Sequence, residues 1–296
     1  MDTSKTAAEF ERHRGHLIGV AYRMLGTLAD AEDAVQESYP RFARTDIGAL
    51  RDVRAWLTRT VARICLDQLG SARARRETYV GPWLPEPAVG TAGQFAAAPL
   101  GPEDRVTLDE SVSMAMLVLL EALSPAERTA FVLQDVLGVP YDEIAGIVGR
   151  SEAACRQLVV RARAHVREGA PRFTPDQGQH ASAVEAFLGA CSRGNIDELV
   201  QVLDPDVVLR SDGGGQVPGV ARHPVTGADK VARLLLGVAA RHDAAVRSGL
   251  VNGSPGLIVE ADGSVLGVMG FTVADSLITE IDFVVNPEKL HRIARS

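Results

Sequence analysis

The sequence predicts a multidomain protein in which two all-α domains precede one α+β domain. Apolar residues recur at helical spacing from residue 7 to about 76 and again from about 104 to 168, whereas strand-like runs appear only after residue 200. A stretch rich in Pro and Gly, residues 79–103, separates the helical blocks as a linker. The 296 residues are enough for two or three domains with separate cores.

Composition argues against a membrane-spanning or disulfide-rich protein. No apolar run approaches the roughly 18 to 20 residues that a membrane span needs, and the N-terminus does not look like a secretory signal. The cysteines Cys65, Cys155 and Cys191 lie far apart and form no C-x-x-C pair. We therefore expect a cytoplasmic protein with reduced thiols, no metal site and no cofactor.

The net charge of -7 argues at first against a protein that binds nucleic acid. The charges are unevenly distributed, however. Residues 51–76 hold seven Arg against two acids and residues 150–172 hold six Arg against two, whereas residues 28–37 hold four acids and no base. We expect two basic surfaces within an acidic chain, although a solvated face is the alternative reading of either one.

The first helical domain is expected over residues 1–78. Its last helix has an inner stripe that comprises Leu57, Val61 and Ile64. This stripe leaves Trp56, Arg59 and Arg63 on another face, and an aromatic ring among arginines suits unstacked bases. Trp56 is equally well explained as a core aromatic.

The helix before it is acidic, with Asp30, Glu32, Asp33 and Glu37 interleaved with apolar residues. Such a face does not favour DNA. It suits docking to a basic protein surface, or it is a solvated face. We expect Pro40 to kink or end this helix, because proline lacks the backbone donor.

The second helical domain is expected over residues 104–172. The segment Ser124-Pro125-Ala126-Glu127 has the pattern of a capping box at a helix start. A short helix near residues 141–148, a tight turn at residues 149–150 and a helix from Ser151 then form a helix-turn-helix candidate.

On the helix from Ser151, one stripe is expected to be buried and comprises Cys155, Val159, Ala162 and Val166. The outer face then comprises Arg156, Gln157, Val160, Arg161, Arg163 and Arg167. A helix that offers Arg and Gln in this way suits the major groove of DNA. A surface helix with solvated arginines is the alternative.

The last domain, residues 180–296, is predicted to be α+β. The expected helices are residues 181–192, 195–203 and 229–240, and the expected strands are residues 207–210, 245–251, 256–260, 265–273 and 277–285. Asp262-Gly263 is a strong hairpin signal between two of these strands. Helices followed by an antiparallel meander predict a curved sheet that wraps over helices.

Taken in order, the motifs resemble the extracytoplasmic-function (ECF) sigma factors of bacterial RNA polymerase. The motifs are DAEDAVQE at residues 30–37, RAWLTR at 54–59 and LSPAER at 123–128 with the helix-turn-helix. WLPEP at 83–87, SDGGG at 211–215 and NPEKL at 286–290 resemble, more narrowly, the SigJ-like subgroup with its C-terminal SnoaL-like domain.

The resemblance implies a promoter-recognising sigma factor with a helical region-2 domain, a helix-turn-helix region-4 domain and a SnoaL-like cone. Its implied partners are promoter DNA and the RNA polymerase core, through the β′ clamp and the β flap. The implied clamp-docking residues are Asp30, Glu32, Asp33, Gln36 and Glu37. Trp56, Arg59 and Arg63 would engage the melted -10 element, and the outer face of the helix from Ser151 would read the -35 element.

The resemblance also implies that the cone regulates the sigma factor by contacting the sigma domains or the linker. The implied contact residues are Trp83, Pro85, Asp212, Gly213, Gly214, Asn286, Lys289 and Leu290. A local anchor and a terminal cap are the alternatives for Trp83 and the 286–290 segment. We expect residues 213–215 to form a flexible turn rather than a phosphate-binding nest, and Gln216 stands where a basic residue is usual.

Two other classes stay open from the residues alone. One is a one-component DNA-binding transcription regulator whose cone senses a ligand. The other is a SnoaL-type enzyme with Asp212, His223 or Asp282 as acid or base. We expect no enzyme, because the sequence shows neither a pocket nor the mutual geometry of these side chains.

Overall fold

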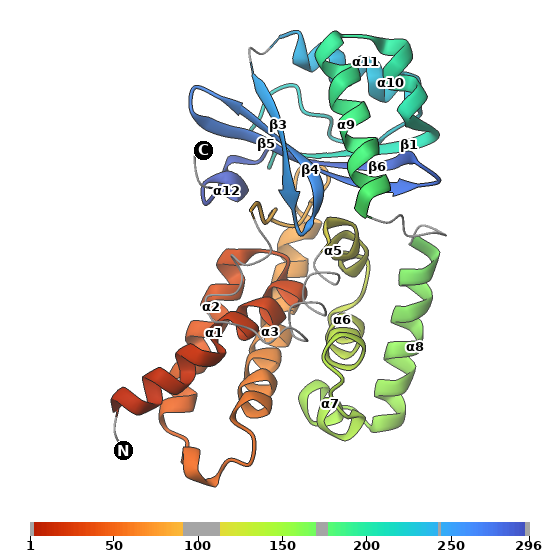
Figure 1. Cartoon of the computed structure of the whole chain (residues 1–296). Helices are drawn as coiled ribbons and strands as arrows, with labels where there is room; N and C mark the ends of the chain where they lie inside the picture. Colours follow the sequence, from red (N-terminus) through yellow and green to blue (C-terminus); the bar gives the residue numbers. More distant parts are fainter. Residues whose placement is uncertain (1–2, 91–112, 170–176, 242–243, 294–296) are drawn as a thin grey trace. The chain divides into compact units, whose positions relative to one another are not determined.

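The computed structural model describes residues 3–90, 113–169, 177–241 and 244–293 (Figure 1). Expected linker and helix residues between 91 and 112 lie outside the described residues. The chain divides into a helical unit, with residues up to 77 and 116–169, and a cone unit, with residues 78–91, 113–115 and 170–296. Most of the N-terminal half of the linker thus groups with the C-terminal sheet.

The helical unit begins with a three-helix core. The elements are α1 (Thr3–Leu25), α2 (Leu28–Ala43), a short 3-10 turn η1 (Ile47–Ala49) and α3 (Val53–Glu77). The predicted stripe of Leu57, Val61 and Ile64 on α3 is buried, and it shares one core with Leu17 and Met24 of α1. Burial at helical spacing therefore sets how these three helices pack.

Helix α2 differs from the expectation at Pro40. The helix continues to Ala43, so Pro40 does not end it, and of the two predicted effects only a kink stays a prediction. Thr27 caps the start, where its hydroxyl oxygen accepts from the Asp30 amide at 3.2 Å. Phe42, beyond the proline, is fully buried, and this packing holds the last turn despite the missing donor.

The second half of the helical unit contains five elements. These are α5 (Met114–Glu121), α6 (Pro125–Phe131), the π-helical turn η2 (Val132–Val136), α7 (Tyr141–Val148) and α8 (Glu152–Gly169). The capping box at Ser124 and Glu127 is confirmed in both directions. Gly149 ends α7 with φ of +69°, the left-handed conformation that glycine adopts most easily. This turn separates the two helices of the helix-turn-helix.

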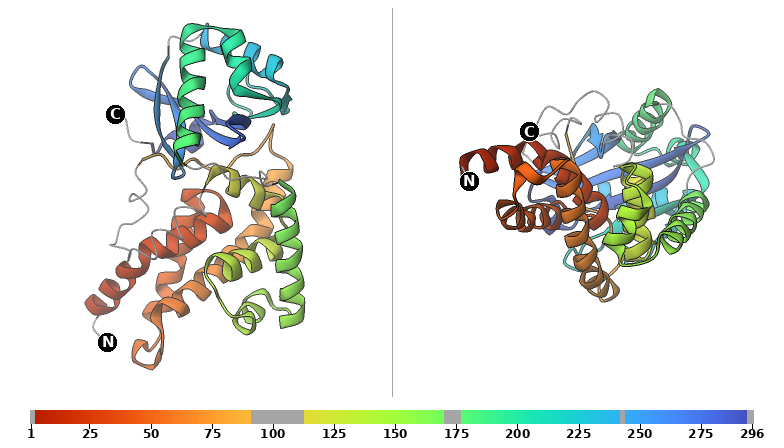
Figure 2. Two further views of the ribbon diagram at one scale, coloured as in Figure 1. Left: turned by 45° about the vertical axis from the view of Figure 1, so that its right-hand side comes forward. Right: turned by 90° about the horizontal axis from the view of Figure 1, so that it is seen from below.

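The cone unit is a six-stranded sheet with its longer helices on one side (Figures 1 and 2). The helices are α9 (Gln177–Arg193), α10 (Ile196–Val202), α11 (Ala228–Ala239) and the short α12 (Pro287–Leu290). The strands are β1 (Leu203–Asp212), β2 (Val225–Thr226), β3 (Ala245–Val251), β4 (Ser254–Ala261), β5 (Ser264–Ala274) and β6 (Leu277–Val284). The α+β prediction is confirmed.

The strand order is β2-β1-β6-β5-β4-β3, and the predicted antiparallel meander is β3 to β6. The sequence did not reveal that β1 pairs with β6 in parallel. This pairing places Asp212, at the end of β1, opposite Val284 and therefore close to the chain that follows β6. The hairpin at Asp262-Gly263 is confirmed, with φ of +51° and +67°.

Candidate nucleic-acid interface and linker contact

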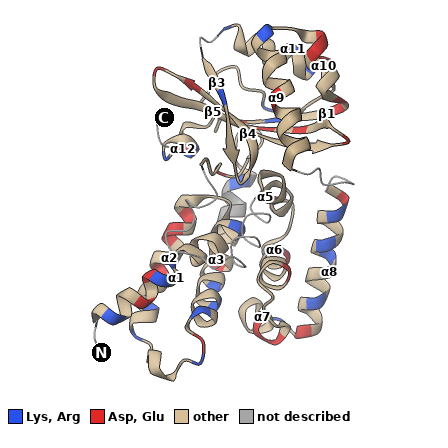
Figure 3. Ribbon diagram, in the orientation of Figure 1, with Lys and Arg blue, Asp and Glu red and all other residues tan. Residues whose placement is uncertain are grey.

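The acidic face expected to dock on polymerase lies on α2 (Figure 3). Asp33, Gln36 and Glu37 are exposed, whereas Asp30 and Glu32 are half-buried. The Thr27 hydroxyl donates to the Asp30 carboxylate at 2.6 Å, so Asp30 also belongs to the start of the helix. Arg41 pairs with Glu37 at 2.8 Å one turn later. The open part of this face therefore centres on Asp33, Gln36 and Glu37.

The first basic surface lies on α3 and includes Trp56, Arg59 and Arg63. Trp56 is half-buried and its ring packs against Phe42, with 5.9 Å between ring centroids. Both readings of Trp56 thus describe part of this side chain, because one part packs on the core and another part remains accessible.

The two arginines of this surface meet acceptors on α7. Arg59 donates to the Glu143 carboxylate at 2.8 Å, and Arg63 donates to the Gly146 carbonyl at 3.2 Å. A cavity of about 580 Å³ lies beside the Arg59–Glu143 pair, lined also by His16, Arg54 and the turn at residues 136–140. No sequence pattern predicts this contact, because the partners are more than 80 residues apart in the chain.

The second basic surface lies on α8. All six predicted outer residues, from Arg156 to Arg167, are exposed, and Cys155, Val159 and Ala162 are buried as expected. Val160 is an exposed aliphatic side chain, with 55% of its surface accessible. The separation of an apolar inner stripe from an Arg- and Gln-bearing outer face is therefore observed.

Carboxylates of neighbouring elements orient several α8 arginines. Arg163 makes a bidentate contact with Asp135 of η2, at 2.8 and 2.7 Å. Arg161 donates to Glu127 at 2.9 Å. Burial opposes the charge of Glu127, but hydrogen bonds from Ser124 and Arg161 outweigh it and lower the pKa of Glu127. The capping box thereby also contacts α8 through Arg161.

Arg156 is held differently, near the start of α8. It donates to Glu152 at 3.1 Å, and its guanidinium lies 4.9 Å from the centroid of the Tyr141 ring. Both contacts are on the exposed surface, where such pairs are weak. Arg156 can therefore exchange them for a base edge or a phosphate.

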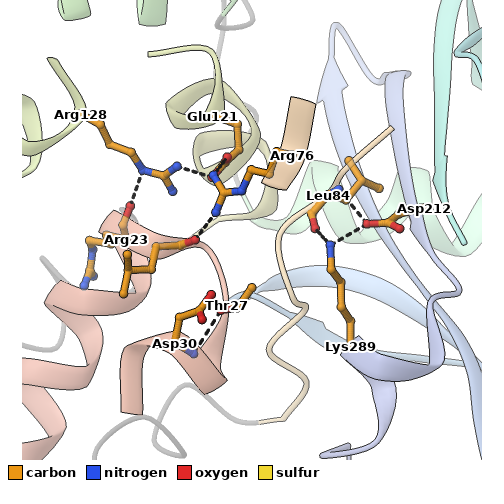
Figure 4. Close-up of polar contacts among 10 residues, drawn as sticks. Arg23, Thr27, Asp30, Arg76, Leu84, Glu121, Arg128, Asp212 and Lys289 are labelled. Carbon is orange, nitrogen blue, oxygen red and sulfur yellow. Dashed lines mark hydrogen bonds and ion pairs between the residues drawn. The ribbon is translucent and has the colours of Figure 1, made fainter. Parts of the chain in front are cut away.

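A buried ion pair between two residues of the cone binds the linker (Figure 4). Lys289 of α12 contacts the Asp212 carboxylate at 2.7 Å, and both side chains are almost fully buried. The same ammonium donates to the Leu84 carbonyl and lies 4.0 Å from the centroid of the Trp83 ring. The Asp212 carboxylate also accepts hydrogen bonds from two linker donors.

Those linker donors are the Leu84 amide, at 2.8 Å, and the Tyr79 hydroxyl, at 2.6 Å. Asn286 in turn donates to the Tyr79 oxygen at 2.8 Å. Burial and the hydrogen bond to Asp212 raise the pKa of Tyr79, so the phenol remains a donor at neutral pH. The contacts of Tyr79 and of the Leu84 backbone were not predicted. Tyr79 lies outside the motifs, and every residue has a backbone amide, so neither gives a sequence signal.

The triple glycine forms a packed turn rather than a flexible one, which corrects the expectation. Gly214 and Gly215 have φ of +63° and +72°. A Cβ on Gly214 would lie 2.7 Å from the Asn286 side chain, and one on Gly215 would lie 2.9 Å from Val80. Glycine is required there because the linker and the segment after β6 approach so closely.

Gln216 and the amide of Gly214 also face protein groups. Gln216 donates to Glu288 at 2.9 Å, and the Gly214 amide donates to Asp212 at 3.1 Å. Position 216, where a basic residue is usual, therefore lies next to the carboxylate of Glu288. The Gly214 amide that a phosphate-binding nest would use already has an acceptor, which agrees with the expectation that no nest is present.

The cone also holds the linker further along and at its far end. Ala88 and Asn252 exchange hydrogen bonds at 3.1 and 2.7 Å, and Val89 forms a bridge with Val251 at the end of β3. Met114 packs on Gly270 of β5, where a Cβ would lie 3.0 Å from the Met114 Cβ. The described part of the linker and the start of α5 therefore contact one sheet.

Two family models match the helical unit. The model described as Sigma-70 region 2 matches residues 10–75, and the model described as Sigma-70, region 4 matches residues 113–166. The ECF RNA polymerase sigma factor SigJ of Mycobacterium tuberculosis is 40% identical over 294 residues, which cover 95% of this chain and 92% of SigJ. The chain is an ECF sigma factor.

Further comparisons agree with this membership. The probable ECF sigma factor SigI of M. tuberculosis is 35% identical, over 96% of this chain and 94% of SigI. The crystal structure of M. tuberculosis SigJ matches with a TM-score of 0.78 and 38% identity, and the match covers 98% of this chain and 100% of that one. The predicted architecture of two helical sigma domains followed by an α+β domain is confirmed.

The candidate acid-base residues of the cone serve other purposes in this sigma factor. Asp212 is bound by Lys289 and the linker, Asp282 pairs with Arg210 at 2.7 Å, and His223 is exposed on a loop. Burial raises the pKa of Asp282 against the opposing effect of Arg210. These contacts do not favour the enzyme hypothesis.

A search of the described residues found no group of His, Cys, Asp or Glu side chains suited to a metal ion. Among the described helices of the sigma factor, none is long and apolar enough to cross a membrane.

Proposed function

We propose that this sigma factor directs core RNA polymerase to promoters whose -35 element is read by α8 and whose melted -10 element is bound by α3. The exposed face of α8 carries this proposal. Its N-terminal part, with Arg156, Gln157 and Val160, offers a bidentate donor, an amide and a methyl-bearing contact, which are the groups that read G, A and T edges. Arg161 and Arg163, oriented by Glu127 and Asp135, are suited to phosphates.

The α3 surface supports the -10 role because of its combination of groups. The accessible part of Trp56 can stack on an unpaired base while Arg59 and Arg63 neutralise the strand. The exposed acids of α2, Asp33 and Glu37, would repel DNA and suit the polymerase clamp. With a net charge of -7, the whole chain is expected to bind free DNA weakly, so promoter engagement depends on polymerase.

We further propose that the cone regulates the sigma factor through the linker. The buried Asp212–Lys289 pair and Trp83 hold residues 79–84, and Val251 and Asn252 hold residues 88–89. Because Met114 contacts the same sheet, the cone fixes both ends of the tether between regions 2 and 4. The cone can thereby set how far the two DNA-binding surfaces separate.

In vitro transcription tests the promoter role. Core polymerase with the full chain should produce transcripts from discrete start sites on a library of promoter fragments. Arg156→Ala and Gln157→Ala should change which -35 sequences are selected, whereas Arg161→Ala should weaken all sequences nearly equally. Failure to bind active core and to produce start-site-specific transcripts would contradict the proposal. A sequence-specific footprint without polymerase would instead favour the one-component regulator.

A further inference from the structure

Within the helical unit, the arginines proposed to bind the -10 strand are bound by region 4. The Glu143 carboxylate accepts from Arg59 at 2.8 Å, and the Gly146 carbonyl accepts from Arg63 at 3.2 Å. Both acceptors lie on α7, the first helix of the helix-turn-helix. A carboxylate that binds an arginine in this way occupies the position that a phosphate would need.

A second contact ties the same two regions at the other end of α3. Glu121 of α5 bridges Arg76 of α3 and Arg128 of α6 (Figure 4). Arg128 also donates to the Arg23 carbonyl of α1 at 3.0 Å, and its side chain is buried. At this end of α3, two arginines share one carboxylate and all three side chains are largely shielded from solvent. Loss of any one of them would leave a charge without its partner.

The two ends therefore differ in how easily they separate. Arg59 and Glu143 keep 38% and 32% of their side-chain surfaces exposed, and the cavity of about 580 Å³ lies beside them. An exposed pair of this kind is weak and is screened by salt. We therefore expect the Arg59–Glu143 end to open first and the Glu121 cluster to separate last.

Promoter geometry requires such an opening. Elements centred near -10 and -35 lie roughly 25 base pairs apart, which is about 85 Å along B-DNA at 3.4 Å per base pair. Arg59 and Glu143 are in hydrogen-bond contact, and α8 has 18 residues, or about 27 Å at 1.5 Å per residue. The helical unit in this arrangement cannot reach both elements at once, and to do so both the Arg59–Glu143 contact and the Glu121 cluster must separate.

We propose that α7 acts as an intramolecular competitor for the -10 strand: Glu143 and the Gly146 carbonyl occupy Arg59 and Arg63 until a nucleic-acid strand replaces them. The inference rests on the proposed role of α3. It assigns Glu143, a residue of region 4, to the control of region 2. The Glu143 carboxylate and a DNA phosphate compete because both are anions that bind the Arg59 guanidinium.

The test uses the full chain and a labelled 20-nucleotide single-stranded DNA of mixed sequence. Glu143→Gln removes the competing charge and should strengthen binding of this DNA about two- to fivefold at low salt, the range of an exposed ion pair. Asp142→Asn is the matched control, because Asp142 is exposed on the same turn of α7 and the change in net charge is equal. This control should have a smaller effect.

A double-mutant cycle separates direct competition from general charge. In an Arg59→Ala chain, Glu143→Gln should give no more strengthening than Asp142→Asn gives. Spin labels on cysteines at Ala43 and Ala164, in a Cys191→Ser background, report the distance between regions 2 and 4. Glu143→Gln should raise the population at long distances, and Asp142→Asn should leave the distribution unchanged.

The outcomes are distinguishable. If Glu143→Gln and Asp142→Asn affect DNA binding equally and leave the distance distribution unchanged, the competition is overturned. A weakening of DNA binding by Arg59→Ala would show in that case that the proposed role of α3 still holds. If Arg59→Ala leaves DNA binding unchanged, the proposed role of α3 fails, and with it the competition for the strand. A shift of the distances by Glu143→Gln would then show only that the contact holds the two regions together.

Discussion

Cation–carboxylate pairs serve different purposes on α8 and in the linker contact. On α8 the arginines are exposed, and their acidic partners orient them without desolvating them. In the linker contact, Lys289 and Asp212 are buried, and backbone groups of Leu84 complete their coordination. Exposed pairs contribute little to stability and can exchange partners, whereas a buried pair fixes the segments that supply it. Burial therefore distinguishes a surface for recognition from one for architecture.

The largest effect is expected when the buried pair loses its cation. Lys289→Met leaves Asp212 as an uncompensated buried charge, which should cost about 3–5 kcal/mol of stability. Urea unfolding of the full chain, followed by the fluorescence of Trp83 in a Trp56→Phe background, measures this cost. Adding Asp212→Asn should restore much of the loss. A midpoint of Trp83 unfolding that does not change in Lys289→Met would show that the pair is not structural.

A smaller effect, and one on binding rather than stability, is expected on α8. Arg156→Ala should weaken binding to the selected promoter by about 1–3 kcal/mol, or roughly 5- to 150-fold, if the side chain contacts a base. The unfolding midpoint of the helical unit should hardly move, because the Arg156–Glu152 pair is exposed. Holoenzyme binding at fixed salt, together with urea unfolding, measures both. A loss of stability comparable to the loss of binding would remove the distinction between the two regions.

His180, a half-buried base, extends the comparison to a group whose charge is opposed by burial. Burial lowers the pKa of His180 below its ordinary value of 6.5, against a hydrogen bond to the Pro255 backbone that raises it. Below pH 6.5 the unfolded chain takes up a proton that the folded cone does not. Stability should therefore fall as the pH drops from about 6.5, by at most about 1.4 kcal/mol per pH unit.

The measurement is the free energy of unfolding of the cone unit at pH 7.5 and at pH 5.5. His180→Gln should reduce the difference between the two values. An equal pH dependence in His180→Gln would show that other groups cause it.

The smallest effect is expected at Glu127. Glu127→Gln keeps the capping box, since glutamine also fits the third position, but it removes the charge that faces Arg161. The loss should stay below about 1 kcal/mol. Because the pKa of Glu127 is lowered, its contribution is present above about pH 4.5 and disappears as the pH falls further. Thermal unfolding at pH 7 and pH 3.5 tests this, with Glu152→Gln as the exposed control.

The sequence predicted the elements that periodicity and capping determine. The stripes of α3 and α8, the capping box at Ser124 and the hairpin at Asp262 all depend on neighbouring residues. Pro40 shows the limit, because tertiary packing of Phe42 maintains a helix that the local rule would end.

The contacts between distant segments could not be predicted in the same way. Motifs identified Trp83, Asp212 and Lys289 as a group, but not that Lys289 pairs with Asp212 beneath Trp83. Arg59 with Glu143, and Glu121 with Arg76 and Arg128, had no sequence signal. Such pairs depend on how whole helices pack, and a charged residue on a helix face is compatible with many partners.

Run-off transcription with core polymerase tests the central claim most directly. It compares the full chain with Trp83→Ala, which removes the ring beside Lys289, and with a chain that ends at residue 175. If the cone controls the tether between regions 2 and 4, both changes should alter transcript yield in the same direction, and the truncation should have the larger effect. Equal yields from all three proteins, with equal binding to core polymerase, would contradict regulation by the cone.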